Sequence, residues 1–404
     1  MLRIRFGAPI ILAGLLAACG GGAAPASAPQ SSAPAKPAAS ASAKPAASAA
    51  TSAAASAKPA ASASAKPAAS GAASAKPAGS AAAKPGGPLT KVNIGLLGSS
   101  SDGGIFIAEE RGYFKEQGIE LESARFQTLV DMVAPTAAGQ LDIAAGAPAA
   151  GLYNAIGRDV PIKIVADKGG TPGPEWDFTG LVLRKDLLDS GKVQKESDLK
   201  GLRLVTSGKG NSPEVALATI LKKGGLKLSD IDFQQMSFPD MVTAMANKGI
   251  DGGIVIEPFL SSIESQGTGK VWKRNMDIFG HNQQIAVIAY GQKIFNNQDL
   301  GRRWMVAYVK GLRDYNDAFG PKKQGYDDVV NILAKNTTVK DPNVIKKMKP
   351  AGLNPDGKLD VKSMQEDIDY YQEAGYLKEK VDLSKLVDTS FQEYAVQQLG
   401  PYKA

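Results

Sequence analysis

The chain has 404 residues, of which 47 are basic, 40 are acidic and one is a cysteine. Residues 1–90 hold eight of the basic residues and no acidic one, leaving 39 basic against 40 acidic residues, so the net charge of +7 belongs to the N-terminal stretch and the remainder does not suggest a nucleic-acid-binding face. The single cysteine, Cys19, excludes a disulfide within the chain and a cysteine nucleophile in the globular part, and no histidine or dense carboxylate cluster with ligand spacing suggests a metal.

The first 19 residues have the three parts of a secretory signal. Arg3 and Arg5 precede an apolar segment, 8–16, that is too short to cross a membrane. The segment leads into Leu-Ala-Ala-Cys, which resembles a bacterial lipobox. We therefore expect Cys19 to be lipidated and to anchor the protein to the bacterial membrane, in the periplasm or at the cell surface. A plain signal peptide with a chance cysteine is the alternative.

A low-complexity stretch of Ala, Ser, Pro and Lys follows, over 20–90. Near-repeats of Ala-Ser-Ala-Lys-Pro-Ala-Ala-Ser occur at 41–48, 55–62 and 63–70, with a variant at 73–80. Apart from alanine the stretch has almost nothing to bury, and its prolines interrupt any helix. The composition predicts a disordered tether that holds a globular part near the membrane.

The globular part begins with an apolar run at 92–97, which predicts a buried strand. A small, polar loop follows at 98–104, and the pattern becomes helical from Ile105. A strand, a loop and a helix in this order aim the N-terminus of the helix at the loop, where free N–H groups can hold a polar or anionic ligand. An ordinary turn capped by Ser or Asp is the alternative.

The remaining elements alternate between strands and helices and then become mainly helical, as in an α/β protein. The further strands or extended runs are expected at 118–122, 140–146, 161–166, 180–186, 202–206, 232–236, 253–256 and 285–291. The helices are expected at 105–114, 126–139, 148–156, 213–223, 239–248, 300–319, 326–335, 361–374 and 383–398. The alternation predicts parallel sheets covered on both faces.

Two short α/β series joined by extended crossings near 183 and 287 predict two lobes with a cleft between them. Lobe I is expected to comprise 91–183 with 288–404, and lobe II to comprise 184–287. Ligands of such sheets bind outside the carboxyl ends of the strands. Four loops or residues fall there: 99–103, Gly146, 207–212 and Glu257.

Several segments, in this order and spacing, resemble a known family. They are Glu109-Glu110-Arg111-Gly112-Tyr113-Phe114 with Gly118-Ile119-Glu120, then 139–143, 161–166, 198–204 and Glu257-Pro258-Phe259. The chain resembles the periplasmic solute-binding proteins of ABC importers for nitrate, sulfonate, taurine and thiamine-pyrimidine precursors, over about 91–320. The resemblance implies a two-lobed type II periplasmic binding protein fold with two hinge strands.

The resemblance also implies what the protein does. It would be an extracytoplasmic lipoprotein that captures a small polar or anionic organic solute, such as a sulfonate, carboxylate or pyrimidine-like molecule. It would deliver the solute to a permease and ATPase, act as a monomer and need no cofactor. By position in the family, and with Trp176 added as a stacking surface, the expected ligand-binding residues are Ser99, Ser100, Ser101, Asp102, Gly146, Ala147, Trp176, Ser207, Gly208, Lys209, Asn211, Ser212 and Glu257.

Several of these residues have a structural alternative. The loop 207–212 forms either a cradle for an anion or an N-cap turn, and Lys209 either neutralises a ligand or is solvated. Glu257 accepts hydrogen bonds from a ligand, braces the hinge or meets the permease. Asp102 fits a capping residue better than a ligand contact. Because Lys209 is the one cation in these loops, a larger, partly apolar organic solute fits better than nitrate.

The aromatic residues and the histidine divide in a similar way. Trp176 lies in a Gly/Pro-rich loop and either stacks on a ligand or packs in the core. Trp272 and Trp304 lie in apolar patterns that predict core positions. His281, the one histidine, fits a structural or exposed role better than a ligand contact.

Two other functions are compatible with the fold. A receptor that senses a solute without transporting it has the same sequence features. A thiamine-pyrimidine synthase-like enzyme is disfavoured, because that group uses an active-site histidine, a pyridoxal-bound lysine and a cysteine-rich iron motif. This chain has only His281 and no cysteine after Cys19.

Overall fold

The computed structural model describes residues 87–404, which fall within one compact unit. The expected signal segment, Cys19 and nearly all of the expected tether lie outside the described residues. Within 87–404, no helix combines the length and the apolar character needed to cross a membrane.

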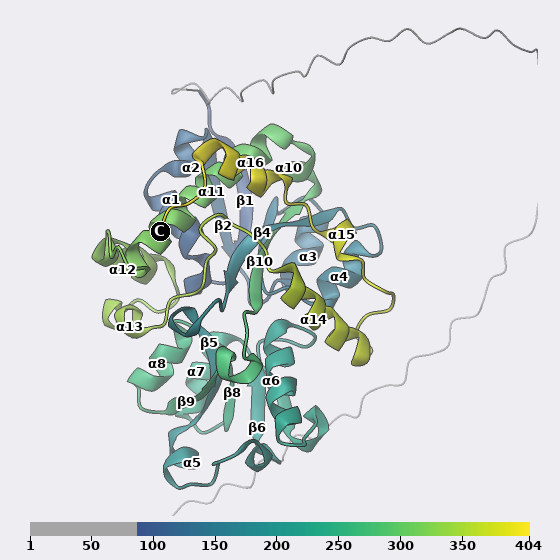
Figure 1. Ribbon diagram of the computed structural model, residues 1–404, viewed down its shortest axis with the longest axis vertical. Helices are drawn as coiled ribbons and strands as arrows, with labels where there is room; N and C mark the ends of the chain where they lie inside the picture. Colours follow the sequence, from purple (N-terminus) through teal and green to yellow (C-terminus); the bar gives the residue numbers. More distant parts are fainter. Residues whose placement is uncertain (1–86) are drawn as a thin grey trace, which may run out of the picture. The chain divides into compact units, whose positions relative to one another are not determined.

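Two five-stranded sheets form the centre of the fold, one in each of two lobes (Figure 1). The first sheet has the order β2-β1-β3-β10-β4 and defines lobe I. Its strands are β1 (Thr90–Leu96), β2 (Ile119–Arg125), β3 (Ile143–Gly146), β4 (Ile162–Gly170) and β10 (Gln284–Gly291). The second sheet has the order β7-β6-β8-β5-β9 and defines lobe II. Its strands are β5 (Thr179–Arg184), β6 (Arg203–Thr206), β7 (Asp232–Gln235), β8 (Gly252–Ile256) and β9 (Gly269–Arg274).

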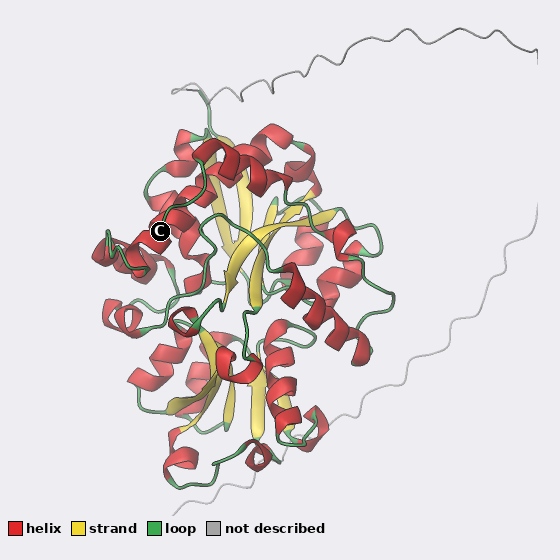
Figure 2. Ribbon diagram, in the orientation of Figure 1, coloured by secondary structure: helices red, strands yellow, loops and turns green. Residues whose placement is uncertain are grey.

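Helices lie on both faces of each sheet (Figure 2). Those of lobe I before the crossing to lobe II are α1 (Gly103–Glu110), α2 (Tyr113–Glu116), α3 (Val130–Ala137) and α4 (Ala150–Ile156). Those of lobe II are α5 (Lys185–Asp189), α6 (Ser212–Lys223), α7 (Phe238–Ala246), α8 (Phe259–Ser265) and α9 (Asn275–Phe279). The C-terminal helices are α10 (Gln292–Asn296), α11 (Gln298–Phe319), α12 (Tyr326–Asn336), α13 (Pro342–Lys347), α14 (Val361–Glu373), α15 (Leu383–Leu386) and α16 (Ser390–Leu399). Short 3-10 turns occur at Ser100–Asp102, Pro174–Trp176, Glu196–Leu199 and Leu228–Asp230.

Alternation along the strands builds the core. In β10, Ile288 and Tyr290 join an apolar cluster with α1 and α11, whereas Val287 and Ala289 join a second cluster with α4 and α14. Successive side chains of a strand point to opposite faces, so a strand buried on both sides supplies both clusters. The first cluster continues into lobe II through residues such as Phe238 and Ile256. Apolar contact therefore runs from one lobe to the other.

The expectation of parallel sheets holds only for part of each sheet, because both sheets also contain antiparallel pairs. β10 is antiparallel to β3 and β4, and β5 is antiparallel to β8 and β9. β5 and β10 each follow a segment that crosses between the lobes. Each of them runs opposite to the parallel strands of its sheet. The crossings lie at 171–178 and 280–283, before the expected points near 183 and 287, because β5 and β10 each pair wholly within one sheet and α9 packs on lobe II.

Two further predictions need correction. Strand β9 was not expected, since Lys270, Lys273 and Arg274 interrupt its apolar pattern, as is common at a sheet edge. The single helix expected over 383–398 is two helices, α15 and α16. Between them Val387 forms a bridge with Ile164, and the Asp388 N–H donates to the Ile164 carbonyl oxygen. The backbone there adds to the free edge of β4 instead of continuing a helix.

A close approach between α1 and α11 holds lobe I together on one face. A Cβ atom added to Gly311 would lie 2.0 Å from the Gly104 carbonyl oxygen. The two helices therefore meet backbone to backbone at this point, next to the loop that precedes α1. Gly173, by contrast, has extended backbone and open space around its Cα.

We predict that Gly311→Ala destabilises the protein by at least about 2 kcal/mol. Alanine favours a helix over glycine by only about 1 kcal/mol, which the clash with backbone exceeds. Urea unfolding measures the difference. Gly173→Ala is the matched control and should leave the midpoint nearly unchanged; equal stability of the two variants would contradict the close packing of α1 on α11.

Candidate functional site

The carboxyl ends of the parallel strands in the two sheets face each other, and the loops that follow them touch. Ser100 donates from its backbone N–H and its hydroxyl to the Glu257 carbonyl oxygen, at 3.1 and 2.9 Å. The Ala150 N–H donates to the Gly210 carbonyl oxygen at 2.8 Å. Lobe I and lobe II are therefore closed on each other at the edge where open α/β sheets bind ligands.

A cavity of about 30 Å³, called the cleft cavity below, lies between these loops. It has room for about one water molecule. Its lining comes from both lobes: Leu97, Ser101, Gln127, Thr128, Leu129, Val130, Ala147, Ala149, Phe178, Ser207, Asn211, Pro213, Phe238, Ile256, Ile285 and Ala286. Eleven of these sixteen residues are apolar and five are polar but uncharged. A larger solute can enter only when the lobes separate.

Asp102 organises the loop after β1. Its Oδ2 accepts hydrogen bonds from the backbone N–H groups of Gly98 and Ser99, at 2.8 and 2.9 Å. Its side chain is fully buried. Asp102 thus caps the turn before α1, the role that fitted it better in the sequence. It accepts from N–H groups that an anionic ligand would need.

A buried lysine completes this loop. Lys168, near the end of β4, places its Nζ 2.8 Å from Asp102 Oδ1 and donates to Ser101 Oγ at 2.8 Å. Both charged side chains have an exposed fraction of 0%. Ser101 lines the cleft cavity, so one hydroxyl separates a buried cation from that cavity. Because Asp102 balances Lys168, the pair contributes no net charge to the cavity.

Glu257 braces the segment between β8 and α8. Its Oε2 accepts from the Ser261 N–H at 2.9 Å, and Arg274 lies 3.5 Å from its Oε1. The Lys349 N–H donates to Oε1 at 3.4 Å. Burial raises the pKa of Glu257, and Arg274 opposes this rise. Its side chain is therefore engaged within the protein, and it does not line the cleft cavity.

The loop after β6 is also held by internal contacts. Asn211 caps α6 by accepting from the Glu214 N–H at 3.2 Å, and it donates to Ser207 Oγ at 3.2 Å. Glu214 in turn accepts from the Gly210 N–H at 2.9 Å. Lys209 places its Nζ 5.0 Å from the centre of the Tyr376 ring. Ser207 and Asn211 line the cleft cavity, whereas Lys209 contacts the C-terminal region.

Trp176 lies at a different place from the one expected. It lines a separate cavity of about 480 Å³ together with Asp167, Asn282 and Asn354. Burial raises the pKa of Asp167 to about 6 there. Phe178, two residues later, is the aromatic residue from this segment that lines the cleft cavity. Trp304 is buried, as predicted for a core residue.

Helix α14 bridges the two lobes. On the lobe I side, Ser363 Oγ accepts from the Gln284 N–H at 2.8 Å. On the lobe II side, Asp367 Oδ2 accepts from Ser212 Oγ at 2.6 Å, and the Tyr370 hydroxyl donates to Glu214 Oε1 at 2.9 Å. These bonds tie the start of α6 to a helix that is fixed to β10.

Asp367 is an unusual residue for such a contact. It is buried, and burial raises its pKa to about 7, with a smaller contribution from the nearby Glu366 carboxylate. The hydrogen bond from Ser212 opposes this rise. Tyr153 and Tyr371 are buried near it, and the pKa of both phenols is raised mainly by burial.

The structure divides the thirteen predicted ligand-binding residues into two groups. Ser101, Ala147, Ser207 and Asn211 line the cleft cavity. The other nine do not line it: Ser99, Ser100, Asp102, Gly146, Trp176, Gly208, Lys209, Ser212 and Glu257. Ligand contact itself stays a prediction for all of them.

Sequence reasoning missed several residues at this site. Lys168 had no signal, because a lysine that follows Asp167 and precedes two glycines fits an exposed turn after the expected strand 161–166. Phe178 and Phe238 had none, because a phenylalanine next to a strand or at the start of a helix fits an ordinary core. Asp367 is separated from Ser212 by 155 residues, so only the fold brings them together.

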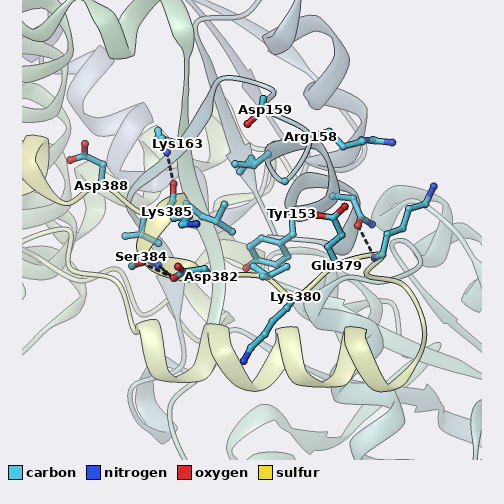
Figure 3. Close-up of a pocket in the computed structure, with 17 residues that line it drawn as sticks. Tyr153, Arg158, Asp159, Lys163, Glu379, Lys380, Asp382, Ser384, Lys385 and Asp388 are labelled. Carbon is cyan, nitrogen blue, oxygen red and sulfur yellow. Dashed lines mark hydrogen bonds between the residues drawn. The ribbon is translucent and has the colours of Figure 1, made fainter.

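A larger cavity of about 670 Å³ lies on lobe I, between the turn after α4 and the segment around α15 (Figure 3). Its lining includes five basic residues and four acidic residues, among them Arg158, Lys380 and Asp388, whose side chains point away from its centre. No residue from lobe II is among the described residues that line it. It lacks the contribution from both sheets that distinguishes the cleft cavity.

Comparison with known proteins identifies the family of the chain and shows which solved structures share its fold. The family model described as "NMT1/THI5 like" matches residues 100–317, which include every strand of lobe II and both crossings. A protein of Brucella abortus (strain 2308) that is named as a candidate binding protein is 27% identical over 240 residues, covering 59% of this chain and 68% of that protein.

Two solved structures show the same fold. The periplasmic nitrate-binding protein NrtA from Synechocystis PCC 6803 superimposes with a TM-score of 0.65 at 14% identity, over 77% of this chain and 89% of that one. The alkanesulfonate-binding protein SsuA from Xanthomonas axonopodis pv. citri, bound to MOPS, gives a TM-score of 0.60 at 14% identity, over 75% of this chain and 100% of that one.

We predict that Lys168→Met destabilises the protein by about 3–5 kcal/mol, because it leaves the Asp102 carboxylate buried without its partner. Adding Asp102→Asn should restore part of the loss. Denaturant unfolding measures both. Lys91→Met, which removes an exposed pair with Glu122, is the control and should change stability little. A Lys168→Met protein as stable as the control would contradict the role of the buried pair.

We predict that the protein becomes less stable as the pH rises from 5 to 8. The pKa of Asp367 is raised in the folded state, so its contribution is fully present below its ordinary pKa and is lost as the pH rises through about 7. The loss should be roughly 2–3 kcal/mol over this range. Asp367→Asn should reduce the slope of stability against pH, whereas Asp369→Asn, exposed on the same helix, should not. Identical slopes for both variants would contradict this assignment.

Proposed function

This chain belongs to the NMT1/THI5-like family, and we propose that it is the solute-binding component of an ABC-type importer. The solute binds between lobe I and lobe II. The closed, loaded form then docks on a permease, and an ATPase subunit supplies the energy for transport. The protein itself catalyses no reaction in this scheme.

One observation carries the proposal: loops from both sheets line the same cavity. Ser101 and Ala147 come from lobe I, and Ser207, Asn211 and Phe238 come from lobe II. Neither lobe forms the cavity alone, because the other lobe supplies the rest of its lining. A site that is complete only when two lobes meet suits a protein that must capture a solute and later release it.

Opening requires a defined set of contacts to break. They include the bonds from Ser100 to Glu257, from Ala150 to Gly210, from Ser212 to Asp367 and from Tyr370 to Glu214. The crossings at 171–178 and 280–283 connect the lobes and are the places for a hinge. Helix α14 stays with β10 on lobe I, to which Ser363 holds it. We propose that lobe I extends over about 91–170 with 284–404 and lobe II over about 179–279, in place of the expected 91–183 with 288–404 and 184–287.

The N-terminal part of the sequence supports a location outside the cytoplasm. In this proposal Cys19 carries a lipid, and the stretch 20–90 tethers a monomeric binding unit near the membrane. The relatives named for nitrate and alkanesulfonate bring those solutes into consideration. Sulfonates, carboxylates and pyrimidine-like molecules are the classes that the sequence suggests.

We predict that Ala147→Trp abolishes solute binding while the protein stays folded. Ala147 is only partly buried and lines the cleft cavity, so an indole there occupies the space that the solute needs. The measurement is the thermal shift caused by nitrate, ethanesulfonate, benzoate, benzamide and 4-aminopyrimidine, tested one by one. A ligand present at 100 times its Kd stabilises the unaltered protein by about 2.7 kcal/mol.

The control is Ala137→Trp, which places the same side chain at an exposed position of α3 away from the cavity. It should keep the full thermal shift. Binding that survives in Ala147→Trp as well as in the control would move the site elsewhere. No thermal shift by any compound in the unaltered protein would count against solute binding.

A further inference from the structure

The chemistry of the cleft cavity narrows the class of solute. Its described lining residues include no Lys, Arg, His, Asp or Glu. Leu97, Phe178, Phe238, Ile256 and Ile285 supply large apolar surfaces from both lobes. The lining offers hydroxyl and amide groups, from Ser101, Gln127, Thr128, Ser207 and Asn211, as its polar side chains.

The first position where an anion could bind is taken by the protein itself. The loop after β1 precedes a helical turn, and its N–H groups are the donors that an anionic ligand would use. Gly98 and Ser99 donate instead to the Asp102 carboxylate, and Ser100 donates to the Glu257 carbonyl oxygen. These three donors are therefore not free to bind an anionic ligand.

The second position where an anion could bind, the N-terminus of α6, is also occupied by groups of the protein. At the start of α6, the Gly210 N–H donates to the Glu214 carboxylate, and the Ser212 hydroxyl donates to Asp367. Pro213, in the first turn, has no N–H to offer. The carboxylates of Glu214 and Asp367 therefore lie at the N-terminus of α6 and accept the hydrogen bonds that an anion would need.

The nearest buried cation, Lys168, does not supply a free positive charge that could balance a bound anion. Lys168 reaches Ser101, but its charge is balanced by Asp102 at 2.8 Å. Lys209, the cation of the second loop, lies over the Tyr376 ring instead of the cavity. An anion enclosed by the closing lobes would lose its water without gaining a cation that balances its charge.

We propose that the cleft cavity selects an uncharged, largely apolar solute with one or two hydrogen-bonding groups, and discriminates against sulfonates, carboxylates and nitrate. The apolar body packs against the two phenylalanines and the aliphatic side chains. The polar end meets Ser101 on one lobe and Ser207 or Asn211 on the other. This inference rests on the proposed function and specifies the solute class of the same site.

Matched pairs of probes with the same carbon skeleton test the inference. The pairs are benzamide and benzoate, hexanamide and hexanoate, and benzenesulfonamide and benzenesulfonate, measured by isothermal titration at pH 7 and physiological salt. In at least one pair the uncharged member should bind saturably, at least 100-fold more tightly than its anionic partner. Ala147→Trp should abolish that binding, and Ala137→Trp should retain it.

The outcomes separate the two proposals. Saturable binding of an anionic member that equals or exceeds that of its uncharged partner would overturn the solute class, while the binding function would stand. Heat signals from none of the six probes, in a protein that unfolds cooperatively, would count against the binding function and against this inference with it.

A charge variant gives a second test. Asp102→Asn leaves Lys168 without its counter-ion, one hydroxyl away from the cavity. In a folded Asp102→Asn protein, the preference for the uncharged probe should fall at least 10-fold. The double variant with Lys168→Met removes both charges and should restore the preference. An unchanged preference in the folded single variant would overturn the charge balance on which the inference depends.

Discussion

The buried ion pair between Asp102 and Lys168 is the interaction on which the site depends most. Asp102 fixes the loop after β1 through two backbone N–H groups, and Lys168 holds the carboxylate from the end of β4. The same loop carries Ser100, which joins the lobes through Glu257, and Ser101, which lines the cleft cavity. Breaking one partner of such a pair leaves a buried charge, which is far more costly than losing an exposed ion pair. One interaction therefore couples local loop structure, lobe contact and the electrostatic neutrality of the cavity.

Apolar and polar contacts make different contributions to the closure of the lobes. A continuous apolar cluster extends from lobe I into lobe II, and it supplies attraction without a fixed geometry. Hydrogen bonds at Glu257, Gly210 and Asp367 then define how the lobes meet. The last of these belongs to α14, so the C-terminal region takes part in closure as well as in the core of lobe I. Because burial raises the pKa of Asp367, we expect this residue to make the stability of the folded protein depend on pH.

The sequence allowed the order of most elements to be predicted, since short apolar runs such as 92–97 and 202–206 fit few structures other than a buried strand. It also indicated the loops at the strand ends, because Ser- and Gly-rich segments there recur in both lobes. It did not indicate which side chains of a loop face the cavity. In the loop 207–212, Ser207 lines the cavity whereas Ser212 bonds to Asp367, and the difference depends on a helix 155 residues away. The sequence suggested Trp176 as the aromatic contact, and the path of the chain into β5 places Phe178 at the cleft cavity instead.

The position of a bound solute tests the central claim most directly. We expect a crystal structure of the protein with a stabilising solute to show that molecule between the lobes, in contact with Ser101 of lobe I and Ser207 of lobe II. The Asp102–Lys168 pair should remain intact beside it. A solute found in the cavity around Arg158 and Lys380, or bound to one lobe only, would contradict the account.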